Sequence, residues 1–124
     1  MKFLIVDDSM TARLIGRKTF ESLGHTVLEA SDGQEALTVL ATQSPIDVII
    51  LDWNMPGMNG FTCLENIRKI SALNRTKVVM CTTEAEKMSV IKALQAGANG
   101  YLLKPVLPDK LKQGVEKALG TSLS

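Results

Sequence analysis

Short apolar runs and longer segments with helical periodicity alternate five times along the chain. The segments expected to form strands are residues Phe3–Val6, Thr26–Ala30, Val48–Leu51, Lys77–Cys81 and Tyr101–Leu103. Helices are expected to begin near Met10, Gly33, Phe61, Glu84 and Pro108. Strands that alternate with helices form a parallel sheet with helices on both faces. We therefore predict an α/β fold, a doubly wound five-stranded parallel sheet flanked by five helices.

Local signals support several of these helix limits. Asp32 is placed to cap the second helix, with Glu35 three residues later. Gly97 supplies a stop for the fourth helix. Gly114 interrupts the last helix at a cost of about 1 kcal/mol relative to alanine, and the sequence gives no reason for it. We expect this helix to run nearly to Ser124 and residues 1–124 to form a single domain.

The composition restricts the class of protein. The chain has 124 residues, of which 45% are hydrophobic, enough for a sizeable core. Its net charge of +1 gives no basic excess for binding nucleic acid or a membrane surface. No apolar run approaches the roughly 20 residues of a membrane span. Cys63 and Cys81 lack the C-x-x-C spacing and are expected to be reduced thiols, which fits a cytoplasmic protein.

Acidic residues follow two of the apolar runs, and a lysine follows another. Asp7 and Asp8 come after the first run, Asp52 after the third and Lys104 after the fifth. Parallel strands place their carboxyl ends on one edge of the sheet, so these side chains should meet in one crevice. Three neighbouring carboxylates repel one another unless a cation lies between them, and a hard divalent metal is the simplest such cation. The lysine would remain able to bind a second anion, so the arrangement suits phosphate chemistry on an aspartate.

Each acidic residue also has a simpler explanation. Asp7 and Asp8 could be a solvated strand end in which one carboxylate caps the next helix. Asp52 could open a turn ahead of Pro56 and Gly57, or it could be a nucleophile that attacks phosphorus. In the second case the backbone carbonyl of Asn54 could also reach the metal.

The residues after the last two strands also have two readings. Thr82 could cap a helix, or it could donate a hydrogen bond to a phosphoryl oxygen. Lys104 could extend into solvent, but its place on the acidic edge favours an ion pair with Asp52 or its phosphate. Pro105 directly after Lys104 invites a cis peptide bond.

Taken together, these residues resemble the receiver domain of bacterial two-component response regulators, especially the single-domain chemotaxis type (CheY-like). The resemblance runs from residue 2 to about residue 119 and implies a flavodoxin-like fold with strand order 2-1-3-4-5. The matching pieces, in the family's order and spacing, are Val6–Ser9, Asp52–Gly60, Thr82 with Glu84 and Ala85, Ala96–Tyr101, and Lys104–Pro105.

The resemblance implies a role for each site residue. Asp52 would accept a phosphoryl group from the phosphohistidine of a sensor histidine kinase. Mg²⁺ would be bound by Asp8, Asp52 and the Asn54 carbonyl directly, and by Asp7 through water. Thr82 and Lys104 would hold the phosphoryl oxygens.

The resemblance also implies a switch. Thr82 would move inward on phosphorylation and Tyr101 would rotate to a buried position, although Tyr101 could equally be an edge aromatic that covers the core. Asn54 and Glu84 occupy the two positions that influence hydrolysis of the acyl phosphate, and they imply a short-lived phosphate. Thr83, Val106 and Gly114 depart from the usual residues of the family and leave the identity of the partner open.

The resemblance predicts a stand-alone, monomeric receiver that catalyses only its own phosphorylation and dephosphorylation. Its partners would be a kinase, a target such as the flagellar motor switch or a phosphotransfer protein, and possibly a phosphatase. Chemotaxis is the leading context, and a phosphorelay intermediate is the alternative.

Three other classes fit the sequence less well. A phosphatase of the haloacid dehalogenase type has its nucleophile after the first strand and needs a second acid two residues later. This chain has Ser9 at that second position. A flavodoxin-like cofactor carrier needs a glycine-rich phosphate loop, whereas Asp7 and Asp8 would repel a phosphate. An unphosphorylated scaffold is disfavoured because every site residue is present.

Overall fold

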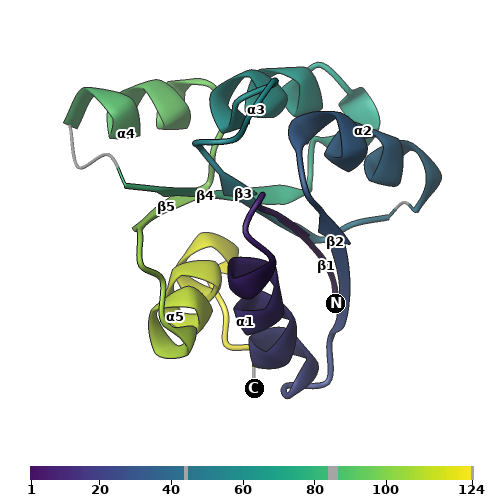
Figure 1. Cartoon of the computed structure of the whole chain (residues 1–124), viewed down its shortest axis with the longest axis vertical. Helices are drawn as coiled ribbons and strands as arrows, with labels where there is room; N and C mark the ends of the chain where they lie inside the picture. The colour runs from purple at the N-terminus through teal and green to yellow at the C-terminus, as the bar shows by residue number, and fades with distance from the viewer. Residues whose placement is uncertain (44, 84–86, 124) are drawn as a thin grey trace.

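The structure, a computed structural model, describes residues 1–43, 45–83 and 87–123, with the backbone alone at 87 and 88. Five parallel strands form one sheet in the order β2-β1-β3-β4-β5, which confirms the predicted fold and strand order. In Figure 1, α1 and α5 cover one face of the sheet, and α2, α3 and α4 cover the other. The strands are β1 Lys2–Val6, β2 Thr26–Ala30, β3 Val48–Asp52, β4 Lys77–Thr82 and β5 Gly100–Leu103; the helices are α1 Met10–Glu21, α2 Gly33–Thr42, α3 Gly60–Arg68, α4 Lys87–Gln95 and α5 Pro108–Leu119.

Most predicted boundaries agree with these limits within one residue. β3 and β4 each extend one residue further than predicted, so Asp52 and Thr82 are the last residues of their strands. The prediction that the last helix continues nearly to Ser124 is wrong. α5 ends at Leu119 because Gly120 adopts a left-handed conformation with a φ of 74°. Glu84, where a helix start was predicted, lies outside the described residues, as does Ser124.

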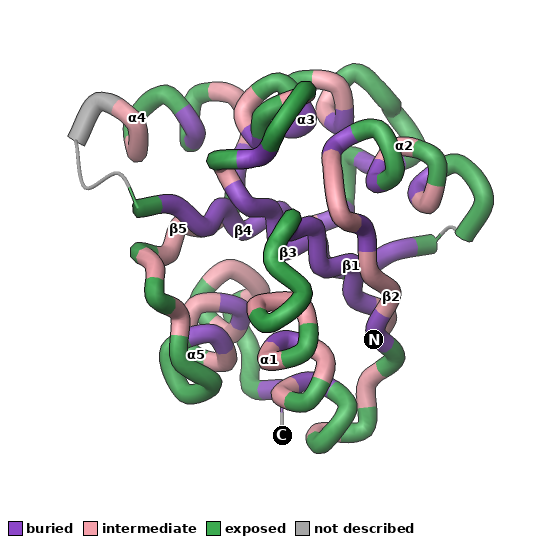
Figure 2. The backbone as a smooth tube through the Cα atoms, in the orientation of Figure 1, coloured by how far each residue is buried: buried purple, intermediate pink, exposed green. Residues whose placement is uncertain are grey.

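The sheet separates two apolar cores, and its three central strands, β1, β3 and β4, are the most deeply buried part of the chain (Figure 2). One core lies between the sheet and α2, α3 and α4, and the other between the sheet and α1 and α5. Alternate residues of β3 point to opposite cores, as the pleat of a strand requires. Asp52 therefore follows Ile50 on the face covered by α1 and α5. This alternation decides which side of the sheet carries the acidic side chains.

Gly114 is explained by the packing of α5 against β5. A Cβ atom at this position would lie 2.6 Å from Cδ2 of Leu102, well inside van der Waals contact. The missing side chain lets the helix approach the strand closely. Leu111 and Val115 of the same helix are buried. No helix in the described part of the chain has the length and apolar content needed to cross a membrane.

Candidate functional site

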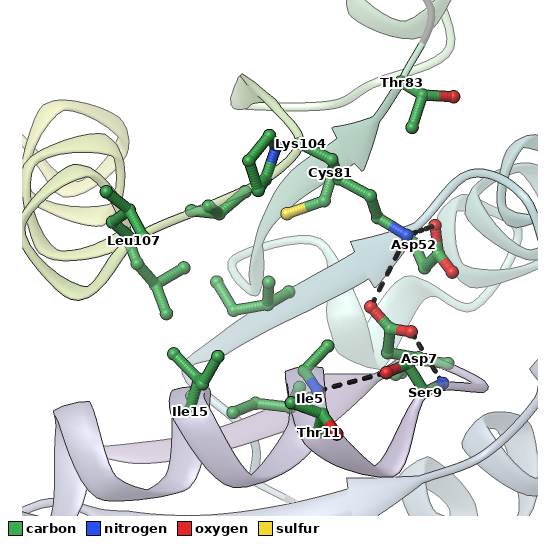
Figure 3. Close-up of a pocket in the computed structure, with 17 residues that line it drawn as sticks. Ile5, Asp7, Ser9, Thr11, Ile15, Asp52, Cys81, Thr83, Lys104 and Leu107 are labelled. Atoms are coloured by element: carbon green, nitrogen blue, oxygen red, sulfur yellow. Dashed lines mark hydrogen bonds and ion pairs between the residues drawn. The ribbon is translucent and has the colours of Figure 1, made fainter.

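Three carboxylates meet at the carboxyl edge of the sheet. Figure 3 shows two of them, Asp7 and Asp52, on either side of Lys104 Nζ. Asp7 follows β1, Asp8 comes next, and Asp52 ends β3. One oxygen from each carboxylate can be chosen so that all three lie within 4.8 Å of one another. Asp7 and Asp52 are only 6% and 1% exposed, whereas Asp8 is exposed. Like charges at this spacing in a buried place favour a bound cation.

Lys104 provides the positive charge opposite these acids. Its Nζ lies 2.6 Å from Oδ1 of Asp52 and 3.7 Å from Oδ2 of Asp7. The backbone N–H of Lys104 donates to the carbonyl of Thr82 at 2.9 Å, which fixes the start of the loop after β5. The Lys104–Pro105 peptide bond is cis, as predicted. With three carboxylates and one ammonium group, the cluster keeps a net negative charge when all four groups are ionised.

Asp52 is in an unfavourable place for a carboxylate. The pKa of Asp52 is raised from 3.8 to about 6. Burial is the main cause and the nearby charge of Asp7 adds to it, while the hydrogen bonds from Lys104 and the Asn54 backbone and the charge of Lys104 act in the opposite direction. Burial alone would lower the pKa of Lys104, but its hydrogen bond to Asp52 and the charges of both acids raise it on balance.

The second carboxylate oxygen of Asp52, Oδ2, indicates that this site fits a bound cation. Oδ2 of Asp52 is buried and has no hydrogen-bond partner in the part of the chain that the structure describes. A buried acceptor without a partner is costly. Carboxylate oxygens are the ligands that Mg²⁺ prefers, so an orphaned oxygen beside two further carboxylates fits a magnesium site.

Asn54 lies over the end of β3 and contacts the loop after β4. Its backbone N–H donates to Oδ1 of Asp52 at 3.2 Å, and its side-chain Nδ2 donates to the hydroxyl of Thr83 at 3.3 Å. Thr83 is one of the residues that depart from the usual pattern of the family. The structure makes it the hydrogen-bond partner of Asn54.

The two expected switch residues are in different surroundings. Thr82 is fully buried at the end of β4, beside Leu103 of β5. Tyr101 is half-buried on β5 and lines a pocket with Leu94 of α4 and Gly114 of α5. Both side chains take part in interactions. Glu84, expected to tune hydrolysis, lies outside the described residues.

A cavity of about 490 Å³ adjoins the cluster between the sheet, α1 and the start of α5. Cys81 lines it from β4, paired in register with Asp52, and sequence reasoning did not assign it to the site. Burial raises the pKa of Cys81 to about 12, so its thiol is neutral and forms part of the wall. Asp7, Asp52, Thr83 and Lys104 border the polar end of the cavity, and its apolar lining includes Ile5, Ile15, Ile50, Val106, Leu107 and Leu111.

Gly60 lets α3 begin against the backbone of Asp52. A Cβ atom at Gly60 would collide with the carbonyl oxygen of Asp52, and the Gly60 N–H donates to the Trp53 carbonyl at 2.8 Å. The ring of Trp53 stacks on Phe61 at a centroid distance of 5.6 Å. Nζ of Lys92 on α4 lies 4.4 Å from the centroid of Phe61. The residue next to Asp52 is thus connected to α4 through α3.

Comparison with known proteins is consistent with this geometry. A family model described as the response regulator receiver domain matches residues 3–116. A chemotaxis protein CheY homolog from Campylobacter jejuni is 45% identical over 98% of this chain and 94% of its own length. Chemotaxis protein CheY1 from Helicobacter pylori is 45% identical over 98% of this chain and 99% of its own length.

Solved structures of chemotaxis proteins are also similar to this chain. The crystallised Vibrio cholerae chemotaxis protein CheY4 superposes with a TM-score of 0.89 and is 36% identical. That comparison covers 94% of this chain and 97% of the other. The relatives thus match over nearly their whole length.

Proposed function

The chain belongs to the response regulator receiver family, and we propose that it is a stand-alone, CheY-like phosphorylation switch with Asp52 as the phosphoryl acceptor. We further propose that residues 1–124 act as a single receiver domain, monomeric and cytoplasmic. The observation that carries the proposal is the state of Asp52. One of its oxygens is paired with Lys104, and the other is buried near Asp7 and Asp8 without a hydrogen-bond partner among the residues that the structure describes.

Mg²⁺ fits the three carboxylates, and Asp8, Asp52 and the Asn54 carbonyl would hold it, with Asp7 acting through water. When bound, the ion neutralises negative charge that would otherwise keep a phosphoryl group away from Asp52.

In the proposed reaction, an Asp52 oxygen attacks the phosphorus of a kinase phosphohistidine. A bond forms between oxygen and phosphorus, the bond between phosphorus and the imidazole nitrogen breaks, and its electron pair leaves with the imidazole. Lys104 already lies 2.6 Å from Asp52, so its ammonium group is placed to follow the charge onto a phosphoryl oxygen. Thr82 donates a hydrogen bond to another phosphoryl oxygen, and Tyr101 responds by turning inward. The catalysis is confined to the protein's own phosphorylation and dephosphorylation.

Asn54, together with Glu84, is proposed to make the phosphate short-lived. The backbone N–H of Asn54 contacts Asp52, so this residue is adjacent to the acyl phosphate that would form. Its side chain is held by Thr83, which gives the position a defined orientation. A phosphate that persisted for hours in Mg²⁺ would contradict this part of the proposal.

The proposed partners are a sensor histidine kinase and a downstream target protein, with a phosphatase as a third. The names of the curated relatives favour a chemotaxis target such as the flagellar motor switch. A phosphorelay intermediate is the second candidate. A haloacid dehalogenase-type phosphatase is disfavoured because Ser9 caps α1 by accepting a hydrogen bond from the Ala12 N–H at 3.2 Å, where that class needs an acid.

The test uses the fluorescence of Trp53, which adjoins Asp52. The emission should change on adding Mg²⁺ and again on adding beryllofluoride, which mimics a phosphoryl group on a carboxylate. Asp52→Asn should lose the second response. No response to either reagent in the parent, with Asp52→Asn indistinguishable from it, would refute the switch.

A second experiment addresses the partner. Beryllofluoride-loaded protein is tested for binding to a flagellar motor-switch peptide and to a histidine phosphotransfer domain. Preferential binding of the peptide supports chemotaxis, and preferential binding of the phosphotransfer domain supports a phosphorelay.

A further inference from the structure

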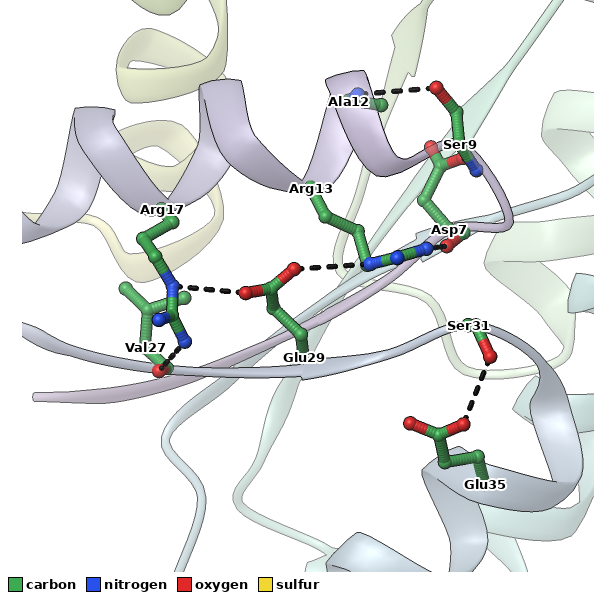
Figure 4. Close-up of polar contacts among 9 residues, drawn as sticks. All are labelled: Asp7, Ser9, Ala12, Arg13, Arg17, Val27, Glu29, Ser31 and Glu35. Carbon is green, nitrogen blue, oxygen red and sulfur yellow. Dashed lines mark hydrogen bonds and ion pairs between the residues drawn. The ribbon is translucent and has the colours of Figure 1, made fainter.

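Arg13 of α1 reaches from its helix to the backbone of the acidic cluster (Figure 4). Its Nη1 donates to the carbonyl oxygen of Asp7 at 2.6 Å. Its Nε donates to Oε1 of Glu29 on β2 at 3.1 Å. The Arg13 side chain is only 14% exposed, so these contacts are largely shielded from water. One guanidinium group therefore connects a metal-site residue to the edge strand of the sheet.

Glu29 is itself held on both sides, since Figure 4 shows its carboxylate between two arginines. Oε2 of Glu29 pairs with Nε of Arg17 at 3.0 Å. Arg17 also donates from Nη2 to the carbonyl of Val27 on the same strand at 3.0 Å. Arg17 thus shares the carboxylate with Arg13, but the structure gives it no bond to Asp7. The two arginines form a natural pair for comparison.

The backbone of Asp7 is bound at both of its polar groups. Its N–H donates to the carbonyl of Ala30 on β2 at 3.1 Å, and its carbonyl accepts from Arg13. The carboxylate is constrained as well, because Oδ1 accepts from the Ser9 N–H at 2.9 Å and Oδ2 faces Lys104. These contacts restrict both the backbone and the carboxylate of Asp7.

We propose that Arg13 is a positioning residue for the metal site and that Glu29 holds Arg13 in place. The inference rests on the proposed function, because it takes Asp7 to be part of a Mg²⁺ site. Arg13 touches neither the ion nor the phosphoryl group in this scheme. It acts through the Asp7 carbonyl, which sets the direction of the Asp7 carboxylate. Groups in this outer layer commonly change metal affinity by about 10–100-fold.

Charge and positioning make opposite demands on Arg13. A cation beside an acidic cluster repels Mg²⁺, so removing its charge should strengthen metal binding if charge were its only role. If Arg13 orients Asp7, removing it should weaken binding instead. The sign of the change in Mg²⁺ affinity therefore separates the two roles.

The experiment compares Arg13→Gln with Arg17→Gln in Mg²⁺ titrations followed by Trp53 fluorescence and by calorimetry. Each variant removes one positive charge from the same Glu29 carboxylate, but only the first removes the bond to Asp7. Arg13→Gln should weaken Mg²⁺ binding about tenfold. Arg17→Gln should leave it unchanged or slightly stronger. Arg13→Lys keeps the charge but cannot bridge two acceptors as a planar fork does, so it should bind Mg²⁺ as weakly as Arg13→Gln.

Thermal unfolding in EDTA ensures that only folded variants are compared. If Arg13→Gln is not folded, Glu29→Gln takes its place, because it keeps Arg13 in the chain and should weaken Mg²⁺ binding, by less than loss of the arginine. Parent-like or tighter Mg²⁺ binding by the folded Arg13 variant, or by Glu29→Gln in its place, overturns the positioning role and leaves the proposed function intact. A parent protein that does not bind Mg²⁺ overturns the proposed function itself, and the inference with it.

Discussion

The strongest consequence of the site geometry concerns the stability of the metal-free protein. Asp52 is 1% exposed, and burial raises its pKa from 3.8 to about 6. Between these two pH values the folded chain binds more protons at this residue than the unfolded chain, so the free energy of unfolding falls as the pH rises. Below pH 3.8 the protonated carboxyl carries no penalty, and above about pH 6 the full penalty is present. The penalty is on the order of 3 kcal/mol at neutral pH.

Asp52→Asn should remove this penalty while preserving the shape of the side chain. We expect the variant to be more stable than the parent at pH 7 in EDTA, by roughly 1–3 kcal/mol. The gain is smaller than the full penalty because Lys104 loses a partner at 2.6 Å. The advantage should shrink towards pH 4, where Asp52 becomes protonated in the folded parent.

Urea unfolding of both proteins from pH 4 to 7.5 measures this difference, since groups that titrate alike in both proteins cancel. Addition of Mg²⁺ should stabilise the parent far more than the variant, because only the parent carries the Asp52 carboxylate. The reasoning would be refuted if the two proteins showed the same stability difference at every pH. A variant less stable than the parent at pH 7 in EDTA would refute it as well.

Three further expectations follow from the structure. Gly60→Ala should destabilise the protein by about 2 kcal/mol or more in urea unfolding, because the new Cβ meets the backbone of Asp52. In the control Gly100→Ala the new Cβ has its nearest neighbour at 3.5 Å, so stability should change by less than about 1 kcal/mol. Equal effects of the two substitutions would contradict the steric argument. Lys104→Met should lower the free energy of unfolding by about 3 kcal/mol at pH 7 in EDTA, because it leaves the buried Asp52 carboxylate without its cation. The loss should be smaller at pH 5, where Asp52 takes up a proton, and a loss independent of pH would argue for lost packing instead. Cys63 and Cys81 should react with a thiol reagent at pH 8 only when the protein unfolds, because both thiols are buried and burial raises their pKa values to about 11 and 12. Rapid labelling of the native protein would contradict this and show that the thiols are accessible.

The fold and the gathering of the acids could be predicted because both leave periodic signals in the sequence. Apolar runs mark the strands, and residues that follow parallel strands must share an edge of the sheet. The end of α5 also has a signal in the sequence, because Gly120 is a residue type that commonly stops helices. Glu84 remains a prediction, since it lies outside the described residues.

Other features of the site leave no pattern in the sequence. The contacts from Arg13 to the Asp7 carbonyl and from Asn54 to Thr83 join side chains to groups whose distance depends on how helices and loops pack. The need for glycine at position 114 depends on where Leu102 of another element comes to lie. A single sequence does not show which elements come close together in this way, because several polar or small residues would suit the local backbone at each of these positions.

The stacked rings of Trp53 and Phe61, with Lys92 against the second ring, affect the fluorescence signal of this protein. The indole adjoins Asp52, the proposed acceptor, at one end and is coupled at the other to α4, a helix on the surface of the molecule. Its emission therefore depends on two places at once. A protein that docks on α4 and shifts Lys92 would change the optical signal even while Asp52 stays chemically unaltered, so one native chromophore can report both the modification and its recognition.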